Sequence, residues 1–138
     1  MNRKHLLAFM AVLFVVLTAC SGTMDGVVRK DAKRVKFEYS GARIGTADVQ
    51  VTMPQGERFE GRTHRGREAT APNAGVSASS DRFETLEGFY GNADAVLFGD
   101  RGNIMKCRFH LTDVLIGFPS GGFGLCQLAD GRVIDIFF

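Results

Sequence analysis

Three cysteines carry the thiol chemistry that this sequence can support: Cys20, Cys107 and Cys126. A thiolate can be alkylated, oxidised to a disulfide or bound to a metal. Cys20 stands alone near the start of the chain, whereas Cys107 and Cys126 both lie in its last third. In an exported protein an odd number of cysteines leaves one thiol for a role other than pairing. The segment before Cys20 therefore decides how all three are interpreted.

Residues 1–19 have the layout of a secretory signal. Arg3 and Lys4 give a positive start, and Leu6 to Leu17 form an uninterrupted apolar run. This run is too short for a permanent membrane-spanning helix, which needs about 20 apolar residues. Small residues follow at the position where such signals are cut. We therefore expect a cleaved signal peptide over residues 1–19.

Leu17-Thr18-Ala19-Cys20 resembles the lipobox of bacterial lipoproteins. The resemblance implies a diacylglycerol thioether on Cys20, cleavage in front of it, and acylation of the new amino group, for example by palmitate. Two acyl chains already give stable membrane anchoring. Ser21, by the sorting rule of such lipoproteins, implies the periplasmic face of the outer membrane of the cell envelope. An ordinary secretory signal followed by an incidental cysteine is the alternative.

Lipid on Cys20 would leave Cys107 and Cys126 as a pair in an oxidising compartment. We therefore predict a disulfide between them, with two buried free thiols as the alternative. Two cysteines alone cannot fill the four-ligand shell of structural zinc. We expect no metal and no cofactor.

The remaining polar residues show no catalytic arrangement. His64 and His110 have no nucleophile beside them, and the carboxylates are scattered singly. Ser120 lacks the preceding glycine spacing of a nucleophile elbow. We expect a protein that is not an enzyme, although one sequence does not exclude a site assembled in three dimensions.

The charge balance does not favour nucleic acid as a partner. The chain has 17 basic and 15 acidic residues, and loss of Arg3 and Lys4 with the signal makes the two numbers equal. Five basic residues between positions 29 and 36 lie close in sequence to Cys20, where each charge near an anionic membrane is worth about 1 kcal/mol. A solvated tether, diluted by Asp31 and Glu38, is the alternative. Arginines at 58–67 alternate with glutamates and indicate a neutral surface.

The elements that must position these residues are mostly strands. Residues 20–33 are small and polar, which predicts a flexible tether, followed by a β-domain over residues 34–138. Hydrophobic residues alternate with polar ones along much of this domain, and turn residues occur at 54–56, 99–102 and 130–131. We expect these residues in the core: Val35, Phe37, Val49, Val51, Phe59, Met105, Phe109, Ile134 and Ile136.

The pattern predicts an all-β fold, a small antiparallel barrel or sandwich of about seven to eight short strands. Residues 65–81 are expected to form a long loop, and residues 82–90 are expected to return to the sheet. A second, glycine-rich loop spans 112–122. Because recognition commonly lies on loops, both are expected contact surfaces.

The two halves of the domain echo one another. Residues 45–48 (Gly-Thr-Ala-Asp) precede Gly56 by the same interval at which residues 91–94 (Gly-Asn-Ala-Asp) precede Gly102. This spacing predicts a repeated hairpin, with coincidence among glycine-rich hairpins as the alternative.

Residues 77–83 (Ser-Ala-Ser-Ser-Asp-Arg-Phe), followed by Gly91, Ala95, Leu97, Gly102 and Cys107, resemble the second half of membrane-bound inhibitors of c-type lysozyme. Those proteins are small β-barrel lipoproteins. The resemblance implies that Ser77, Ser79 and Arg82 lie on a loop that enters the lysozyme cleft.

Taken together, these patterns predict a lipid-anchored envelope protein whose β-domain binds or scaffolds an envelope protein. Inhibition of lysozyme in the periplasm is the alternative function.

Overall fold

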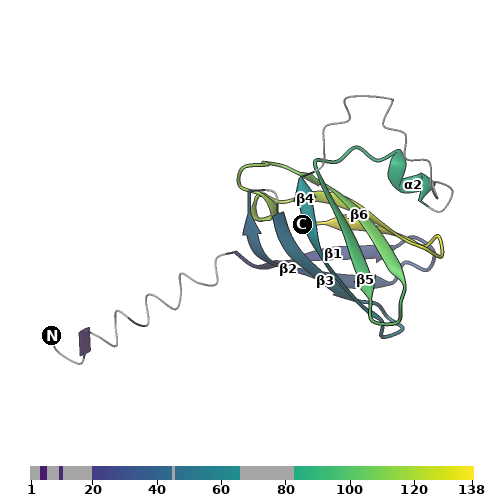
Figure 1. Ribbon diagram of the computed structural model, residues 1–138, viewed down its shortest axis with the longest axis horizontal. Helices are drawn as coiled ribbons and strands as arrows, with labels where there is room; N and C mark the ends of the chain where they lie inside the picture. The colour runs from purple at the N-terminus through teal and green to yellow at the C-terminus, as the bar shows by residue number, and fades with distance from the viewer. Residues whose placement is uncertain (1–3, 6–9, 11–19, 45, 66–82) are drawn as a thin grey trace.

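The computed structural model describes residues 4–5, 10, 20–44, 46–65 and 83–138. Its core is a closed barrel of eight antiparallel strands (Figure 1). None of the helices among these residues is long and apolar enough to span a bilayer. The strands are β1 (Gly22–Val28), β2 (Arg34–Arg43), β3 (Thr46–Thr52), β4 (Arg58–Arg65), β5 (Ala93–Gly99), β6 (Ile104–Leu111), β7 (Gly122–Leu128) and β8 (Val133–Phe137).

Each strand pairs with the next one along the chain, and β8 pairs back with β1. This closure pairs both edges of every one of the eight described strands. The all-β prediction is therefore confirmed, with the barrel rather than the sandwich as the architecture.

Alternation along the strands builds the core. In β2, Val35 and Phe37 point inward and are buried, while Lys36 and Glu38 point outward. A barrel of eight strands has an interior just wide enough for side chains to fill. Every residue that the sequence placed in the core is buried there: Val35, Phe37, Val49, Val51, Phe59, Met105, Phe109, Ile134 and Ile136.

The predicted tether over residues 20–33 is wrong, because most of it is strand β1 and its turn. Met24 pairs with Phe37 of β2, and Gly26 pairs with Ile136 of β8. Gly26 faces the interior, where a Cβ atom would lie 2.8 Å from Val35 and 2.9 Å from Phe37. Side chains from neighbouring strands thus fill the space that a larger residue in β1 would occupy. The folded domain therefore begins at Gly22, twelve positions before the predicted boundary.

The up-and-down order gives the barrel two different ends. The first, which we term the Cys20 end, holds Cys20, the β2–β3 connection, the β6–β7 connection and Phe138. The opposite end, the turn end, holds the short connections at 29–33, 53–57, 100–103 and 129–132. In Figure 1 the chain enters the barrel on the left, where the green-yellow β6–β7 connection also lies.

Residues 83–90 do not return to the sheet as a strand. They contain the short helix α2 (Glu84–Glu87), which lies on the outside of the barrel (Figure 1). Phe83 and Leu86 pack against Leu125 in a small hydrophobic cluster separate from the interior. Phe83 and Leu86, which helped to suggest a strand, are therefore buried against the outer surface of the barrel.

Both halves of the sequence echo are hairpins, β3–β4 and β5–β6. They carry the same ion pair at equivalent positions, Asp48 with Arg62 and Asp94 with Arg108. The predicted repeated hairpin is thus present in the fold.

Candidate functional site

Cys20 lies at the barrel end named after it, and its side chain is exposed. The Cys20 carbonyl oxygen accepts a hydrogen bond from the Ala42 backbone N–H at 3.1 Å. The residue is therefore held directly against the end of β2 with no spacer. A group attached to this thiol would sit next to the barrel end.

Cys107 and Cys126 form the predicted disulfide. They are direct partners in the pairing of β6 with β7, and both are buried in the barrel interior. The bridge ties two neighbouring strands from inside. It is a structural element of the core and is not accessible for chemistry at the surface.

Ser77, Ser79 and Arg82, the predicted lysozyme-binding residues, lie outside the described residues. The histidines do not come together. His64 is exposed on β4, whereas His110 is half-buried on β6, where its ring stacks on Phe123 with 5.0 Å between centroids. Within the described part of the chain, no group of three or more His, Cys, Asp or Glu residues is arranged to hold a metal ion.

The basic residues nearest to Cys20 in sequence lie far from it in space. Arg29, Lys30 and Lys33 belong to the β1–β2 connection at the turn end. The Arg29 guanidinium donates two hydrogen bonds to Asp135, at 2.7 and 2.8 Å, and this carboxylate raises the pKa of Arg29. Strand β1 carries the chain to the other end of the barrel, so closeness in sequence to Cys20 does not place these basic residues beside it.

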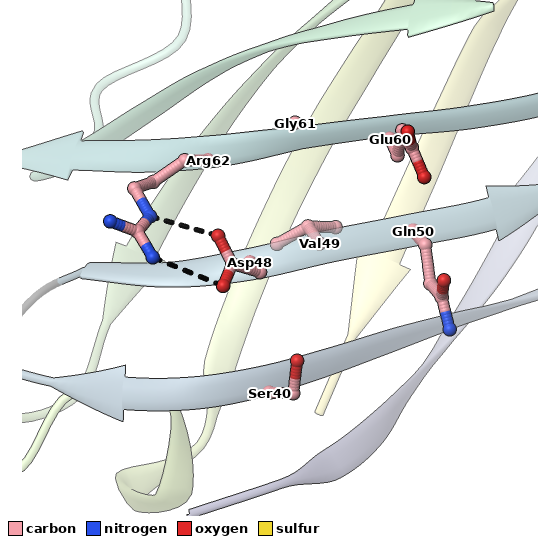
Figure 2. A pocket seen from close by; sticks show the side chains of 7 residues that line it. All are labelled: Ser40, Asp48, Val49, Gln50, Glu60, Gly61 and Arg62. Carbon is pink, nitrogen blue, oxygen red and sulfur yellow. Dashed lines mark hydrogen bonds and ion pairs between the residues drawn. The ribbon is translucent and has the colours of Figure 1, made fainter.

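A polar groove of about 420 Å³ runs along the outer wall over β2, β3 and β4 (Figure 2). Figure 2 shows Arg62 reaching across from β4 to Asp48 on β3. Arg62 Nε donates to one carboxylate oxygen at 2.8 Å and Nη2 to the other at 3.1 Å. The lining residues are Ser40, Asp48, Val49, Gln50, Glu60, Gly61 and Arg62.

The charges of this wall are largely satisfied within the protein. The hydrogen bonds from Arg62 lower the pKa of Asp48, and the carboxylate raises the pKa of Arg62. The Gln50 side chain on β3 links its two neighbouring strands. Its amide N–H donates to Glu38 on β2, and its amide oxygen accepts from Arg58 on β4. The groove offers hydrogen-bonding groups to a polar ligand, but the carboxylate of Asp48 is held in an ion pair with Arg62.

The β6–β7 connection, predicted as a contact loop, has two functions in the fold. The 3-10 helix η2 (Phe118–Ser120) inserts Phe118 into the barrel mouth, where it packs on Tyr39, Phe109 and Phe138. Burial in this aromatic plug raises the pKa of Tyr39. The same connection points Leu115 and Ile116 into solvent, with exposed fractions of 74% and 58%.

The outer wall of β5 and β6 carries an apolar patch that sequence reasoning missed. Val96, Phe98 and Ile104 point outward with exposed fractions of 40%, 61% and 37%. Phe98 and Ile104 are direct partners across the two strands, next to the turn end. The signal was present in the sequence, because residues 95–98 are an unbroken apolar run in which both faces of the strand are apolar.

Comparison with known proteins finds no matching family model, no matching curated protein and no matching solved structure. The site is therefore interpreted from its own residues.

Proposed function

We propose that this protein is a lipoprotein of the outer membrane, anchored by acyl chains on Cys20, whose barrel binds or scaffolds an envelope protein without catalysis. The signal pattern before Cys20 supports the anchor. The exposed position of Cys20 at one end of the barrel is compatible with acylation, because the thiol is not buried in the fold.

The filled interior supports binding at the outer surface. Side chains of all eight strands form one core cluster inside the barrel, and the aromatic plug covers the mouth at the Cys20 end. A partner would therefore contact the outer wall or the connections between strands.

The apolar patch of Val96, Phe98 and Ile104 is the observation that carries the binding function. Contiguous exposed hydrophobic side chains on a folded domain are characteristic of protein interaction sites. The patch lies toward the turn end, so an anchor at Cys20 would direct it away from the membrane and into the periplasm.

Replacing Cys20 with Ser tests the anchor. We expect the native protein to fractionate with outer membranes and to carry acyl chains by mass spectrometry, and the variant to be soluble or unprocessed. A processed variant that remains in the membrane would contradict the proposal.

A matched pair of variants tests the binding function. Phe98→Glu places a charge in the apolar patch, whereas Thr52→Glu places one on the polar wall of β3. With envelope extract as the source of partners, we expect Phe98→Glu to lose a partner that the native protein and Thr52→Glu both retain. Equal retention by all three would exclude the patch as the binding site.

The closed antiparallel barrel is also the fold implied by the resemblance to lysozyme inhibitors. This second candidate function predicts that the protein slows c-type lysozyme and that Ser79→Ala or Arg82→Ala abolishes the effect. Inhibition that survives both substitutions would place the contact elsewhere.

A further inference from the structure

Exposed apolar side chains lie at the same end of the barrel as Cys20. Leu115 and Ile116 project from the β6–β7 connection, and Ile44, 61% exposed, follows β2 two residues after the hydrogen-bond partner of Cys20. Strand β2 also contacts η2 of the β6–β7 connection. These three side chains therefore share the barrel end at which the proposed acyl chains begin.

The β6–β7 connection holds its apolar tip in a defined conformation. One carboxylate oxygen of Asp113 accepts hydrogen bonds from the backbone N–H groups of Leu115, at 2.8 Å, and Ile116, at 3.1 Å. Ser120 closes the loop, since its hydroxyl donates to the Gly117 carbonyl at 2.6 Å and accepts from the Asp113 N–H at 3.0 Å. With Phe118 fixed in the barrel mouth, the exposed position of Leu115 and Ile116 is built into the fold.

Aromatic side chains are also exposed at the Cys20 end of the adjoining wall. Phe123 and Phe137 are direct partners at the Cys20 end of β7 and β8, and both point outward. Tyr90, 68% exposed, lies beside His110, which stacks on Phe123. Aromatic residues at this level are typical of the region where a protein meets lipid head groups.

We propose that the Cys20 end docks directly on the bilayer, with Leu115, Ile116 and Ile44 inserted into the lipid surface beside the acyl chains. The inference rests on the proposed lipoprotein function and adds an orientation to it. Because Cys20 is bonded to the barrel without a spacer, acyl chains that enter the membrane bring this end against it. The β6–β7 connection then contacts lipid, and the apolar patch on β5 and β6 faces the periplasm.

Single tryptophans can test this orientation, because the chain contains none. Ile116→Trp and Leu115→Trp place an indole at the Cys20 end, and Phe98→Trp places one with a comparable native exposure, 61% against 58% for Ile116, near the turn end. The mature protein, produced from the full-length chain and beginning at Cys20, would be reconstituted in phosphatidylethanolamine–phosphatidylglycerol vesicles containing brominated phospholipid. Circular dichroism would establish that each variant retains the β fold.

We expect the indoles at 115 and 116 to emit at shorter wavelength and to be quenched by the brominated lipid, and the indole at 98 to behave as in water. No quenching at 115 and 116, or quenching only at 98, would overturn the docking. Mass spectrometry of Cys20 in the same sample separates the two proposals. Acylated protein with no quenching contradicts the docking alone, whereas quenching without acyl chains supports the docking and contradicts the lipoprotein assignment.

Discussion

Glu57 is a buried acid whose carboxyl group accepts a hydrogen bond from a neighbouring turn. Its side chain is 2% exposed and faces the interior at the turn end, where Oε2 accepts a hydrogen bond from Asn103 Nδ2 at 2.8 Å. Oε1 has no hydrogen-bond partner among the described residues. When a buried polar group has few hydrogen-bond partners, the loss of one of them destabilises the folded protein.

Asn103→Ala should therefore destabilise the barrel by about 1–3 kcal/mol, the usual cost of leaving a buried acceptor unsatisfied. Urea unfolding of the variant and the native protein measures the difference. In the Glu57→Gln background the same substitution should have a different cost, because Asn103 then contacts an amide in place of a carboxyl group. Equal costs in both backgrounds would show that the Glu57–Asn103 bond contributes nothing specific.

The Asp48–Arg62 pair should make stability depend on pH. The folded-state pKa of Asp48 is lowered, so the contribution of the pair is fully present above the ordinary Asp pKa of about 3.9. It is lost as the pH falls through the folded pKa. Asp48→Asn should lower the urea midpoint slightly at neutral pH and not at about pH 2, and the difference should shrink in high salt because the pair is exposed.

Glu60→Gln provides the control for this measurement. Glu60 faces the same groove but makes no ion pair with another described residue. Its substitution should leave the pH profile close to that of the native protein. A profile shifted as much as that of Asp48→Asn would assign the effect to the general charge of the wall.

At the scale of single elements, the disulfide is the main covalent constraint. It joins β6 to β7 across a sequence separation of 19 residues. Loop-closure entropy for a bridge of this span corresponds to about 3 kcal/mol of stabilisation.

Replacing Cys107 and Cys126 together by Ala should lower the free energy of unfolding by at least about 3 kcal/mol, with a further loss from the buried volume removed. Urea unfolding with and without a reducing agent measures the effect, and Cys20→Ser serves as the variant that keeps the bridge. Two alkylatable thiols at 107 and 126 in the unreduced, unfolded protein would contradict the bridge.

At the scale of the whole molecule, strand β1 determines whether the barrel closes. It pairs with both β2 and β8, so its removal would open two sheet edges and uncover the interior. A tether, by contrast, can be removed without effect on the domain that it carries.

Deletion of residues 21–33 should therefore abolish cooperative unfolding in urea. It should also abolish the dispersion of amide proton signals that a folded protein shows by NMR. The same chain lacking only residues 1–19 is the control and should remain folded. A deletion variant with an intact, cooperative β fold would show that β1 is dispensable.

Most strands and turns could be predicted from the sequence because their signals are local. The alternation of Val35, Phe37 and Tyr39 with polar residues indicates which side of a strand is buried, and Asp130-Gly131 indicates a tight turn. The disulfide followed from the number of cysteines and the expected compartment. The candidate site was harder to predict from the sequence, since the polar groove and the patch around Phe98 each combine residues from neighbouring strands.

Local sequence signals were sufficient to predict the β architecture, the core residues and the pairing of Cys107 with Cys126. Only the tertiary structure decided that residues 22–28 are a strand, because Val35 and Phe37 fill the space at Gly26 from another strand. The tertiary structure also places Arg29 at the opposite end of the barrel from Cys20, and Leu115 at the same end as Cys20. A local pattern records that a side chain is buried or exposed, but its neighbours in space depend on how the strands close into a barrel.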